Sequence, residues 1–416
     1  MSTTSDAPAA APSPSGGKPG SRLRTRLEAV SREAWYGWGG IALGLIAFYV
    51  TLPPILVRSL IPSLLIAATG LALGVVALRA GEKRVGWGAV VACVAGAFGA
   101  YGAVESGVTN LERVVVWSAL LAAALRYATP LTFAALGGVT SERSGVVNIG
   151  LEGMMLMGAF FGAWGADVTG TWVGGILIGL AAGAVTGLLH AVFAVTLRAD
   201  QIVSGTAINF LALGVTGFLF VKIYGAQGTP DDLPEIPDVH LPIGWIPFIG
   251  DALEQLNLLI WVALIAVALL SIFLFRTRQG LRLRSVGENP LAADTAGISP
   301  IRMRYYAVIA SGAFASLGGV FLSIGFVHSF SQNMIFGKGF IGLAAVIFGK
   351  WRPGGALAAA MLFGFSSALA QRLPVFSPTT AVLFQALPYV LTLIAVAGLV
   401  GRSRPPAADG IPYERH

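Results

Sequence analysis

The sequence predicts an all-α fold, a polytopic transmembrane helical bundle with about 10–12 membrane segments, some of them broken or re-entrant. Hydrophobic residues make up 55% of the 416-residue chain, and charged residues only 11%. A soluble domain carries roughly a quarter charged residues, so this chain lacks the solvated surface that a globule of its size needs. The 54 glycines suit helices that approach one another closely in lipid.

Apolar runs set the candidate membrane segments, because a helix needs about 20 apolar residues to cross the hydrocarbon core. The candidate spans are approximately 37–57, 60–78, 86–103, 114–138, 145–166, 172–197, 202–224, 257–275, 305–326, 339–350, 354–372 and 380–400. The run at 339–350 is too short for an ordinary crossing. If it is re-entrant, the C-terminus changes sides.

The two ends of the chain are predicted to be cytoplasmic tails, residues 1–34 and 402–416. The first tail is rich in Ala, Pro, Ser and Gly and ends in a basic stretch, which is typical of disorder. It lacks the basic region followed by an apolar run that marks a cleaved signal peptide. We therefore expect a multi-pass protein of the plasma (inner cell) membrane with its N-terminus in the cytoplasm.

Charge segregation between the loops indicates the orientation, since Lys and Arg favour the cytoplasmic side. The loop between 276 and 304 is crowded with arginines, whereas the loop 225–256 contains six acidic residues and no Lys or Arg. We predict that 276–304 is cytoplasmic and that 225–256 is external, irregular and ordered by its prolines. The net charge of +7 then reflects topology and contact with membrane lipids, and no nucleic-acid partner is expected.

Two glycine-rich regions with charged residues interrupt the apolar pattern, at 137–153 and 336–355. Paired interruptions in two halves of a chain indicate a transporter's substrate pathway. A tight loop that joins two ordinary crossings is the alternative for each region.

Catalytic, nucleotide-binding and metal-binding patterns are not found. A P-loop requires Gly-Lys-Ser or Gly-Lys-Thr, but Gly339 follows Gly337-Lys338. The four histidines match no metal-ligand spacing, and the single cysteine, Cys93, excludes an intrachain disulfide and is expected to be buried. We expect no catalytic residues, no metal and no cofactor bound by this chain.

One cytoplasmic segment has the start and stop signals of a short helix. Pro290 suits the first turn, Asn289 can cap it, and Gly297 can end it. A helix of about two turns is unstable alone in water, so it needs a partner surface. The predicted docking segment comprises Gly287, Glu288, Asn289, Pro290, Ala292, Ala293, Asp294, Ala296 and Gly297, with Ala292, Ala293 and Ala296 forming a small-residue face. An amphipathic loop lying on the membrane is the alternative.

This segment resembles the coupling loop of permease subunits in ABC importers of the branched-chain amino acid, ribose and nucleoside type. The runs Thr129-Pro130-Leu131, 142–155 and 344–353 also resemble motifs of that group. The similarity is strongest to nucleoside or simple-sugar permeases that work with a basic-membrane-protein type binding lipoprotein. It covers about 114–400, so residues 114–401 are assigned as the permease core and 35–113 as extra N-terminal transmembrane helices.

The resemblance implies a transport subunit that is not itself an enzyme, with ATP used by a separate partner. The implied partners are an ATP-binding ABC subunit, a related second permease subunit and an extracytoplasmic substrate-binding lipoprotein. The implied cargo is a nucleoside or simple sugar.

Polar residues within the spans are the candidates for the substrate pathway, because burying them in lipid is costly. Asn148 and Glu152 are four residues apart, so a helix there would place both on one face, and both can bind ribose hydroxyls or base edges. Asn209 is a further candidate, and an interhelical hydrogen bond is the alternative for each. Arg126, midway in a span, can meet an anionic partner or pair with Glu152.

An ion-coupled secondary transporter of a small polar solute is the alternative function. It would need acidic or histidine residues within the spans to carry ions, and Glu152 is the clearest acidic candidate. The charge-poor spans and the docking segment favour the ATP-driven importer.

Overall fold

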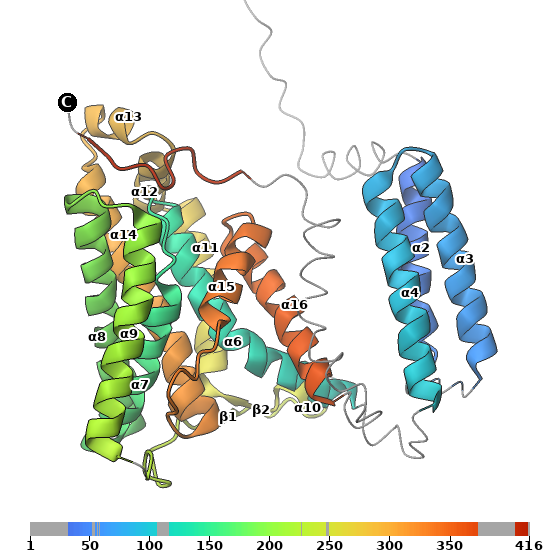
Figure 1. Ribbon diagram of the computed structural model, residues 1–416, viewed down its shortest axis with the longest axis horizontal. Coiled ribbons are helices and arrows are strands. Elements are labelled where there is room, and N and C mark those ends of the chain that lie inside the picture. The colour runs from blue at the N-terminus through green and yellow to red at the C-terminus, as the bar shows by residue number, and fades with distance from the viewer. Residues whose placement is uncertain are drawn as a thin grey trace, which may run out of the picture. The chain divides into compact units, whose positions relative to one another are not determined.

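The computed structural model describes residues 32–51, 55, 57, 59–105, 116–225, 227–246, 249–372 and 404–414. Contacts divide the chain into two compact units, Met1–Glu105 and Ser106–His416, and each is described by itself (Figure 1). The predicted span 380–400 and most of the predicted tail 1–34 lie outside the described residues. The last three residues of that tail are helical, because the first helix begins at Arg32.

The first unit is a bundle of helices that pack on one another: α2 (Arg32–Tyr49), α3 (Leu60–Arg79) and α4 (Lys83–Glu105). Glycines permit the close approach, since a Cβ atom on Gly96 would collide with the Gly44 carbonyl. Cys93 is 1% exposed, as predicted, and its thiol donates to the Gly40 carbonyl oxygen at 3.3 Å.

The second unit holds the remaining described elements. They are α6 (Trp117–Glu142), α7 (Leu151–Thr169), α8 (Trp172–Ala191), η1 (Val192–Thr196), α9 (Gln201–Tyr224), β1 (Asp238–His240), α10 (Ile249–Leu253), β2 (Gln255–Asn257), α11 (Leu258–Arg276), α12 (Arg278–Glu288), α13 (Pro290–Thr295), α14 (Pro300–Val320), η2 (Phe321–Val327), α15 (Lys338–Phe348) and α16 (Pro353–Arg372). The all-α prediction is confirmed. The small antiparallel pair β1–β2 falls in the predicted irregular loop 225–256, with β2 ending one residue beyond it.

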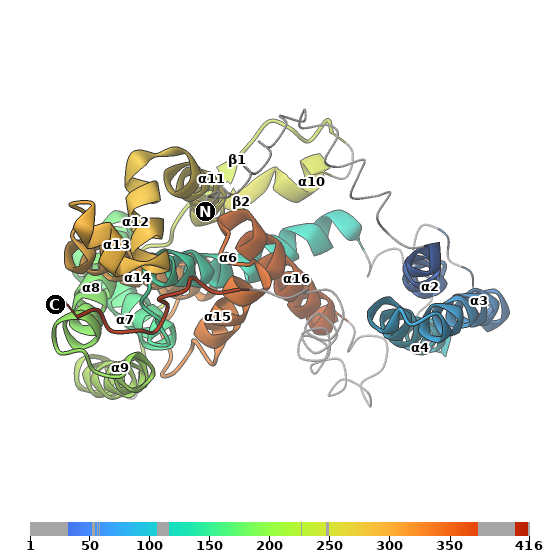
Figure 2. The ribbon, with the colours of Figure 1, turned by 90° about the horizontal axis from the view of Figure 1, so that it is seen from above.

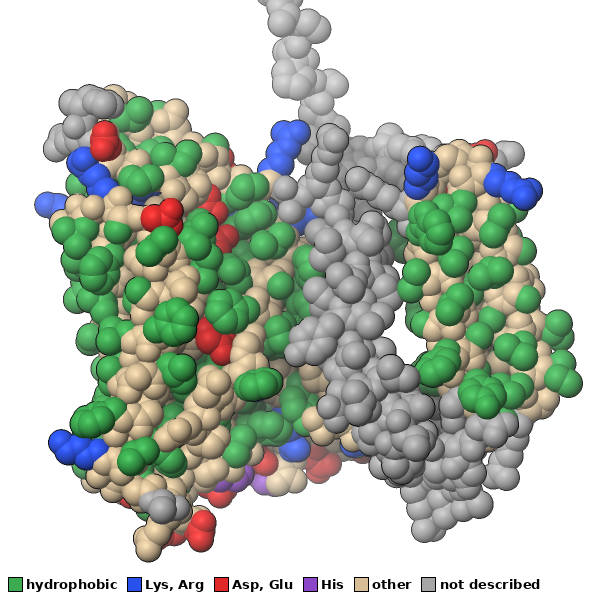
Figure 3. Space-filling view, in the orientation of Figure 1, with side chains coloured by type: hydrophobic (Ala, Val, Ile, Leu, Met, Phe, Trp, Pro, Cys, Tyr) green, Lys and Arg blue, Asp and Glu red, His purple; other side chains and the backbone are tan. Residues whose placement is uncertain are grey.

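Seven helices among the described residues are long and apolar enough to cross a membrane. They are Leu60–Arg79, Trp117–Glu142, Trp172–Thr196, Gln201–Tyr224, Leu258–Arg276, Pro300–Val327 and Pro353–Arg372. In the Ser106–His416 unit, Figure 3 shows hydrophobic side chains spread over the visible face, with most of the charged side chains near its two ends. A lipid-facing band explains why so many large apolar side chains are exposed.

Helix α14 is the centre of this unit and packs against α6, α7 and α8 (Figure 2). Small residues make the contact close. A Cβ atom on Gly319 would collide with the Met155 carbonyl, and one on Gly183 with the Ser316 side chain. Phe133, Met155 and Phe321 fill the core beside these contacts, so van der Waals packing holds the bundle together.

Two ends of this unit matter for function. The α13 end carries α12, α13, the start of α14 and residues 404–414, and the sheet end carries β1, β2 and α10 (Figure 1). Helix α15 has only 11 residues, which confirms that 339–350 is too short for an ordinary crossing. A turn at Gly349–Arg352 joins it to α16, and the two helices pack on each other.

Candidate functional site

The first glycine-rich interruption contains a break between two helices, whereas the second predicted region, 336–355, is mostly helix α15 and its turn to α16, and a second break lies just before it. Residues 143–150 lead from α6 to α7 without helical structure, and residues 328–337 do the same between η2 and α15. Gly145 and Gly337 have φ angles of +88° and +83°, a left-handed conformation that ends a regular helix and that glycine adopts without strain. The first break reaches far into the bundle, because Asn148 contacts Ser311, in the middle of α14.

Side chains from distant helices satisfy the exposed backbone of the first break. Gln201 accepts from the Val147 amide at 2.7 Å, and Asn209 donates to the Ile149 carbonyl at 3.1 Å while accepting from the Gly153 amide at 2.8 Å. His190 lies 3.0 Å from the Val147 carbonyl. Irregular backbone is tolerated within a membrane bundle only when such partners are present, so these polar residues stabilise the break.

Glu152 joins the two breaks. One carboxylate oxygen accepts from the Gly337 amide and the other from the Gly339 amide, each at 2.6 Å. A Cβ atom on Gly339 would lie 2.6 Å from the Glu152 backbone, so a side chain there would block the contact. The backbone amides at the start of α15, which lack partners within the helix, therefore donate to the Glu152 carboxylate. Helix N-termini favour such an anionic partner.

The predicted pair Asn148 and Glu152 does not share a helix face. Asn148 precedes α7, whose cap is Gly150, because the glycines end the helix before it reaches Asn148. Asn148 is fully buried and donates to the Ser311 hydroxyl at 2.8 Å, while its Oδ1 atom lacks a hydrogen-bond partner. Asn148, Glu152 and Asn209 thus all lie at the first break and bind the chain itself. Their contact with substrate stays a prediction.

We expect Glu152→Gln to loosen the junction between the two breaks. A glutamine side chain has one acceptor oxygen, so one of the two glycine amides would lose its partner at a cost of about 1–3 kcal/mol. Thermal unfolding of the purified protein should shift to lower temperature, and solute uptake should fall.

The matched control is Asp167→Asn, at the other end of α7, where the carboxylate accepts a hydrogen bond from Tyr224 at 2.9 Å. Asparagine keeps an acceptor for that single donor. The melting temperature of the Asp167→Asn variant should therefore stay close to that of the wild-type protein. Equal melting temperatures for Glu152→Gln and wild type would contradict the joining role of Glu152.

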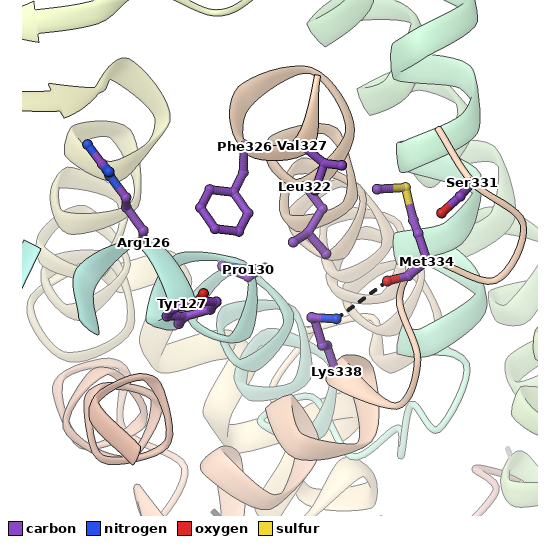
Figure 4. Close-up of a pocket in the computed structure, with 9 residues that line it drawn as sticks. All are labelled: Arg126, Tyr127, Pro130, Leu322, Phe326, Val327, Ser331, Met334 and Lys338. Atoms are coloured by element: carbon purple, nitrogen blue, oxygen red, sulfur yellow. Dashed lines mark hydrogen bonds between the residues drawn. The ribbon is translucent and has the colours of Figure 1, made fainter. Parts of the chain in front are cut away.

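A cavity of about 270 Å³, here called the Arg126 cavity, lies beside this junction. Its lining comes from α6, η2, the second break and α15, as Figure 4 shows: Arg126, Tyr127, Pro130, Leu322, Phe326, Val327, Ser331, Met334 and Lys338. A second cavity of about 190 Å³ shares Arg126 and Phe326 with it and adds Asp238, Asn257, Phe321, Gly325 and His328. The two cavities together reach the sheet end.

The Arg126 cavity combines two cations with aromatic rings. Arg126 does not pair with Glu152, and its side chain forms no hydrogen bond or ion pair within the described residues. The Lys338 amino group donates to the Ile335 carbonyl at 3.1 Å and to the Met334 carbonyl at 3.4 Å, which holds it beside the cavity; Figure 4 draws the bond to Met334. The rings of Tyr127 and Phe326 meet edge to face, with centroids 5.6 Å apart. Such a site offers hydrogen-bond donors and a stacking surface to a small polar ligand.

Helix α13 is the predicted docking helix, and its capping is confirmed. The Asn289 side chain accepts from the Ala292 amide at 3.0 Å, Pro290 occupies the first turn, and Gly297 has a φ of +79°. The predicted small-residue face is partly wrong, because Ala293 is only 3% exposed. It packs inward, since the six-residue helix turns this side toward its own protein. Leu291, Ala292 and Ala296 are exposed and form the outer face.

Sequence reasoning missed several parts of the site. Helix α12 precedes α13 within the predicted loop, although its Thr277 cap is a local signal that could have located it. Tyr127, Phe326 and Lys338 were not predicted to meet at a cavity. Only the mid-span position of Arg126 indicated a functional site there.

Comparison with known proteins identifies the class of this chain. Residues 120–396 match the family described as branched-chain amino acid transport system / permease component. The chain therefore belongs to this family of membrane permeases. No solved structure matches it.

Individual relatives of the chain have names that state a substrate. The chain is 45% identical to the guanosine ABC transporter permease protein NupQ of Bacillus subtilis (strain 168), over 73% of this chain and 98% of NupQ. It is 42% identical to the nucleoside ABC transporter permease protein NupC of Lactococcus lactis subsp. cremoris (strain MG1363), over 74% and 98% of the two chains. The putative glucose ABC transporter permease protein TsgC13 of Haloferax volcanii is 37% identical, over 61% and 77%.

The first two strains each also hold a second, less similar permease. These are the guanosine ABC transporter permease protein NupP, 27% identical, and the nucleoside ABC transporter permease protein NupB, 29% identical. The unit Met1–Glu105 lies outside the family match.

Proposed function

We propose that this chain is a translocation subunit of an ATP-driven importer for nucleosides. The observation that carries the proposal is its 45% and 42% identity to a guanosine and a nucleoside ABC transporter permease, over 98% of each relative. Simple sugars are the second candidate substrates, because a putative glucose permease is 37% identical.

The Arg126 cavity supports the nucleoside over the sugar. A nucleobase has a planar face that can stack on an aromatic ring, and edge acceptors that an arginine can donate to. Phe326 and Tyr127 supply the rings and Arg126 the donor. A sugar presents hydroxyls and C–H faces but no planar aromatic face, so it would stack on the rings less closely than a nucleobase.

Asn148, Glu152 and Asn209 would then act on the pathway by shaping its wall. Glu152 fixes the turn that carries Lys338 into the cavity, and Asn209 fixes the break before Glu152. Two broken helices that meet near the middle of a bundle are typical of transporter binding sites.

The proposed orientation places the α13 end in the cytoplasm and the sheet end outside, with the N-terminus cytoplasmic. The arginines of α12 and the acidic residues of the loop 225–256 support it. A separate ATP-binding subunit would dock on α13 and hydrolyse ATP, and an extracytoplasmic binding lipoprotein would deliver substrate at the sheet end. This chain would itself catalyse no reaction and bind no cofactor.

The second permease subunit is proposed from the paired proteins NupP and NupQ, and NupB and NupC. A tagged chain should then co-purify with a related permease in equal amount. Recovery of an active homodimer would contradict the pairing, which departs from the usual symmetry of oligomers.

An ion-coupled mechanism receives little support. The Glu152 oxygens both bind backbone amides, and Glu142 accepts a hydrogen bond from the Trp351 indole. Carboxylates that are engaged in this way are poorly placed to exchange protons or sodium with a pathway.

The experiment that tests the proposal is the ATPase activity of the purified full complex in lipid nanodiscs. Binding protein loaded with guanosine, other nucleosides or sugars is added in turn. We expect nucleosides to stimulate hydrolysis about tenfold more than sugars. Stimulation by sugars alone would overturn the nucleoside assignment and leave the importer class intact.

A further inference from the structure

Residues 404–414, here called the C-terminal strap, lie across the α13 end of the bundle (Figure 1). Pro406, Ala408 and Tyr413 of this segment are buried. Since irregular chain at a terminus usually stays solvated, burial of these three side chains indicates a segment that is bound to the bundle.

The strap binds both helices of the docking loop. The Ala408 amide donates to the Gly287 carbonyl at 2.9 Å, and the Ala407 amide donates to the Glu288 carboxylate at 3.3 Å. The Tyr413 hydroxyl donates to the Asp294 carboxylate at 2.9 Å. The strap therefore holds the end of α12 and the body of α13 on the side opposite to the exposed outer face.

The same segment also binds the body of the permease. The Arg304 guanidinium donates to the Ile411 carbonyl at 2.9 Å and to the Ser144 carbonyl at 3.3 Å, so one buried side chain bridges the strap and the first break. A Cβ atom on Gly145 would lie 3.0 Å from the Ala408 carbonyl oxygen, which shows how closely the two backbones approach.

Charge contributes less to this contact than the buried hydrogen bonds do. Burial raises the pKa of Asp409 in the strap to about 7, and the nearby Arg304 guanidinium opposes the shift. An exposed ion pair between Arg198 and Glu414, at 3.1 Å, lies near the end of the strap. Exposed pairs contribute little, so the buried contacts decide its position.

We propose that the C-terminal strap is the mechanical link between the docking helix α13 and the first break, so that it transmits movement of the ATPase subunit to the Arg126 cavity. The inference rests on the proposed function. The path runs from α13 through the strap to residues 144–147, then along the start of α7 to Glu152 and the Lys338 turn. A helix of six residues has little stability of its own. Gly287, at the end of α12, packs directly on the Arg143 carbonyl, and the strap adds the Tyr413 hydrogen bond that holds α13 itself.

The test compares the wild-type complex with a chain that ends at Pro405 and with Tyr413→Phe, which removes only the hydroxyl bound to Asp294. The matched control is Glu414→Gln, which removes only the exposed ion pair. Each full complex is reconstituted with its ATPase, second permease and binding protein. The readouts are ATPase co-purification, nucleoside transported per ATP hydrolysed, and hydrogen exchange of residues 285–297.

Truncation should leave the ATPase bound, lower the transport per ATP about tenfold, and speed exchange of residues 285–297 about tenfold. Tyr413→Phe should lower the transport per ATP about threefold and speed the hydrogen exchange of residues 285–297 about threefold. Glu414→Gln should change neither quantity. Unchanged transport per ATP, or loss of ATPase binding with unchanged exchange, overturns the link. Failure of the proposed function is distinguishable, because the wild-type complex itself would then move no nucleoside, whereas the exchange measurement needs no substrate.

Discussion

Leu291→Asp should abolish ATP-driven uptake, because it places a charge at the centre of the docking surface. Leu291 is 51% exposed on the outer face of α13, beside Ala292. Burying a leucine against a partner contributes about 1.5–3 kcal/mol, and a buried unpaired carboxylate reverses that gain. We expect the ATPase subunit to bind at least about tenfold more weakly. Co-purification of the ATPase measures this directly.

Leu281→Asp is the matched control, since Leu281 is 60% exposed on the neighbouring α12. The control should retain the ATPase, and both variants should still insert and bind the second permease. Full uptake with Leu291→Asp would make α13 a membrane-surface element. Because Ala293 is buried, substitutions at that position would disturb the loop itself and are less informative.

Arg126→Met should lower nucleoside uptake about 10–100-fold, because it removes a charged donor and keeps a similar volume in the cavity. A hydrogen bond to a charged group contributes about 1.5–3 kcal/mol. Since Arg126 has no partner within the described residues, its loss should not unfold the bundle. Concentration-dependent uptake by the reconstituted complex measures the effect.

Lys222→Met is the control for this substitution. Lys222 is an exposed cation near the end of α9 and does not line the Arg126 cavity, so transport should be unchanged. Normal uptake by Arg126→Met would place the substrate pathway elsewhere. Unchanged ATPase binding in both variants would show that the defect lies in the cavity.

Local signals explain what the sequence predicted well. The docking helix was predicted to within one residue at its C-terminal end, because Asn289, Pro290 and Gly297 act within a few positions of one another. Apolar runs located, to within a few residues, the seven helices of the described residues that are long and apolar enough to cross a membrane. The first break was recognised as a glycine-rich interruption, but the second break, at 328–337, overlaps the predicted region 336–355 only at residues 336–337, and the pairing of the two breaks required the fold.

Long-range partners explain what the sequence could not predict. Glu152 binds amides 185 and 187 residues away, and Tyr413 binds Asp294 at a separation of 119 residues. Neither pairing leaves a periodic or spacing signal in the chain. Asn148 was misplaced on a helix because the spacing of four residues was applied across Gly150, where α7 has not yet begun.

The most direct test of an ATP-driven nucleoside importer is uptake of labelled guanosine into proteoliposomes that contain the full complex and its binding protein. ATP is supplied to the face that carries the ATPase, with no ion gradient across the membrane. We expect guanosine to accumulate against its gradient with ATP, and not with a non-hydrolysable analogue. Accumulation that requires a proton or sodium gradient and proceeds without ATP would contradict this and identify a secondary transporter.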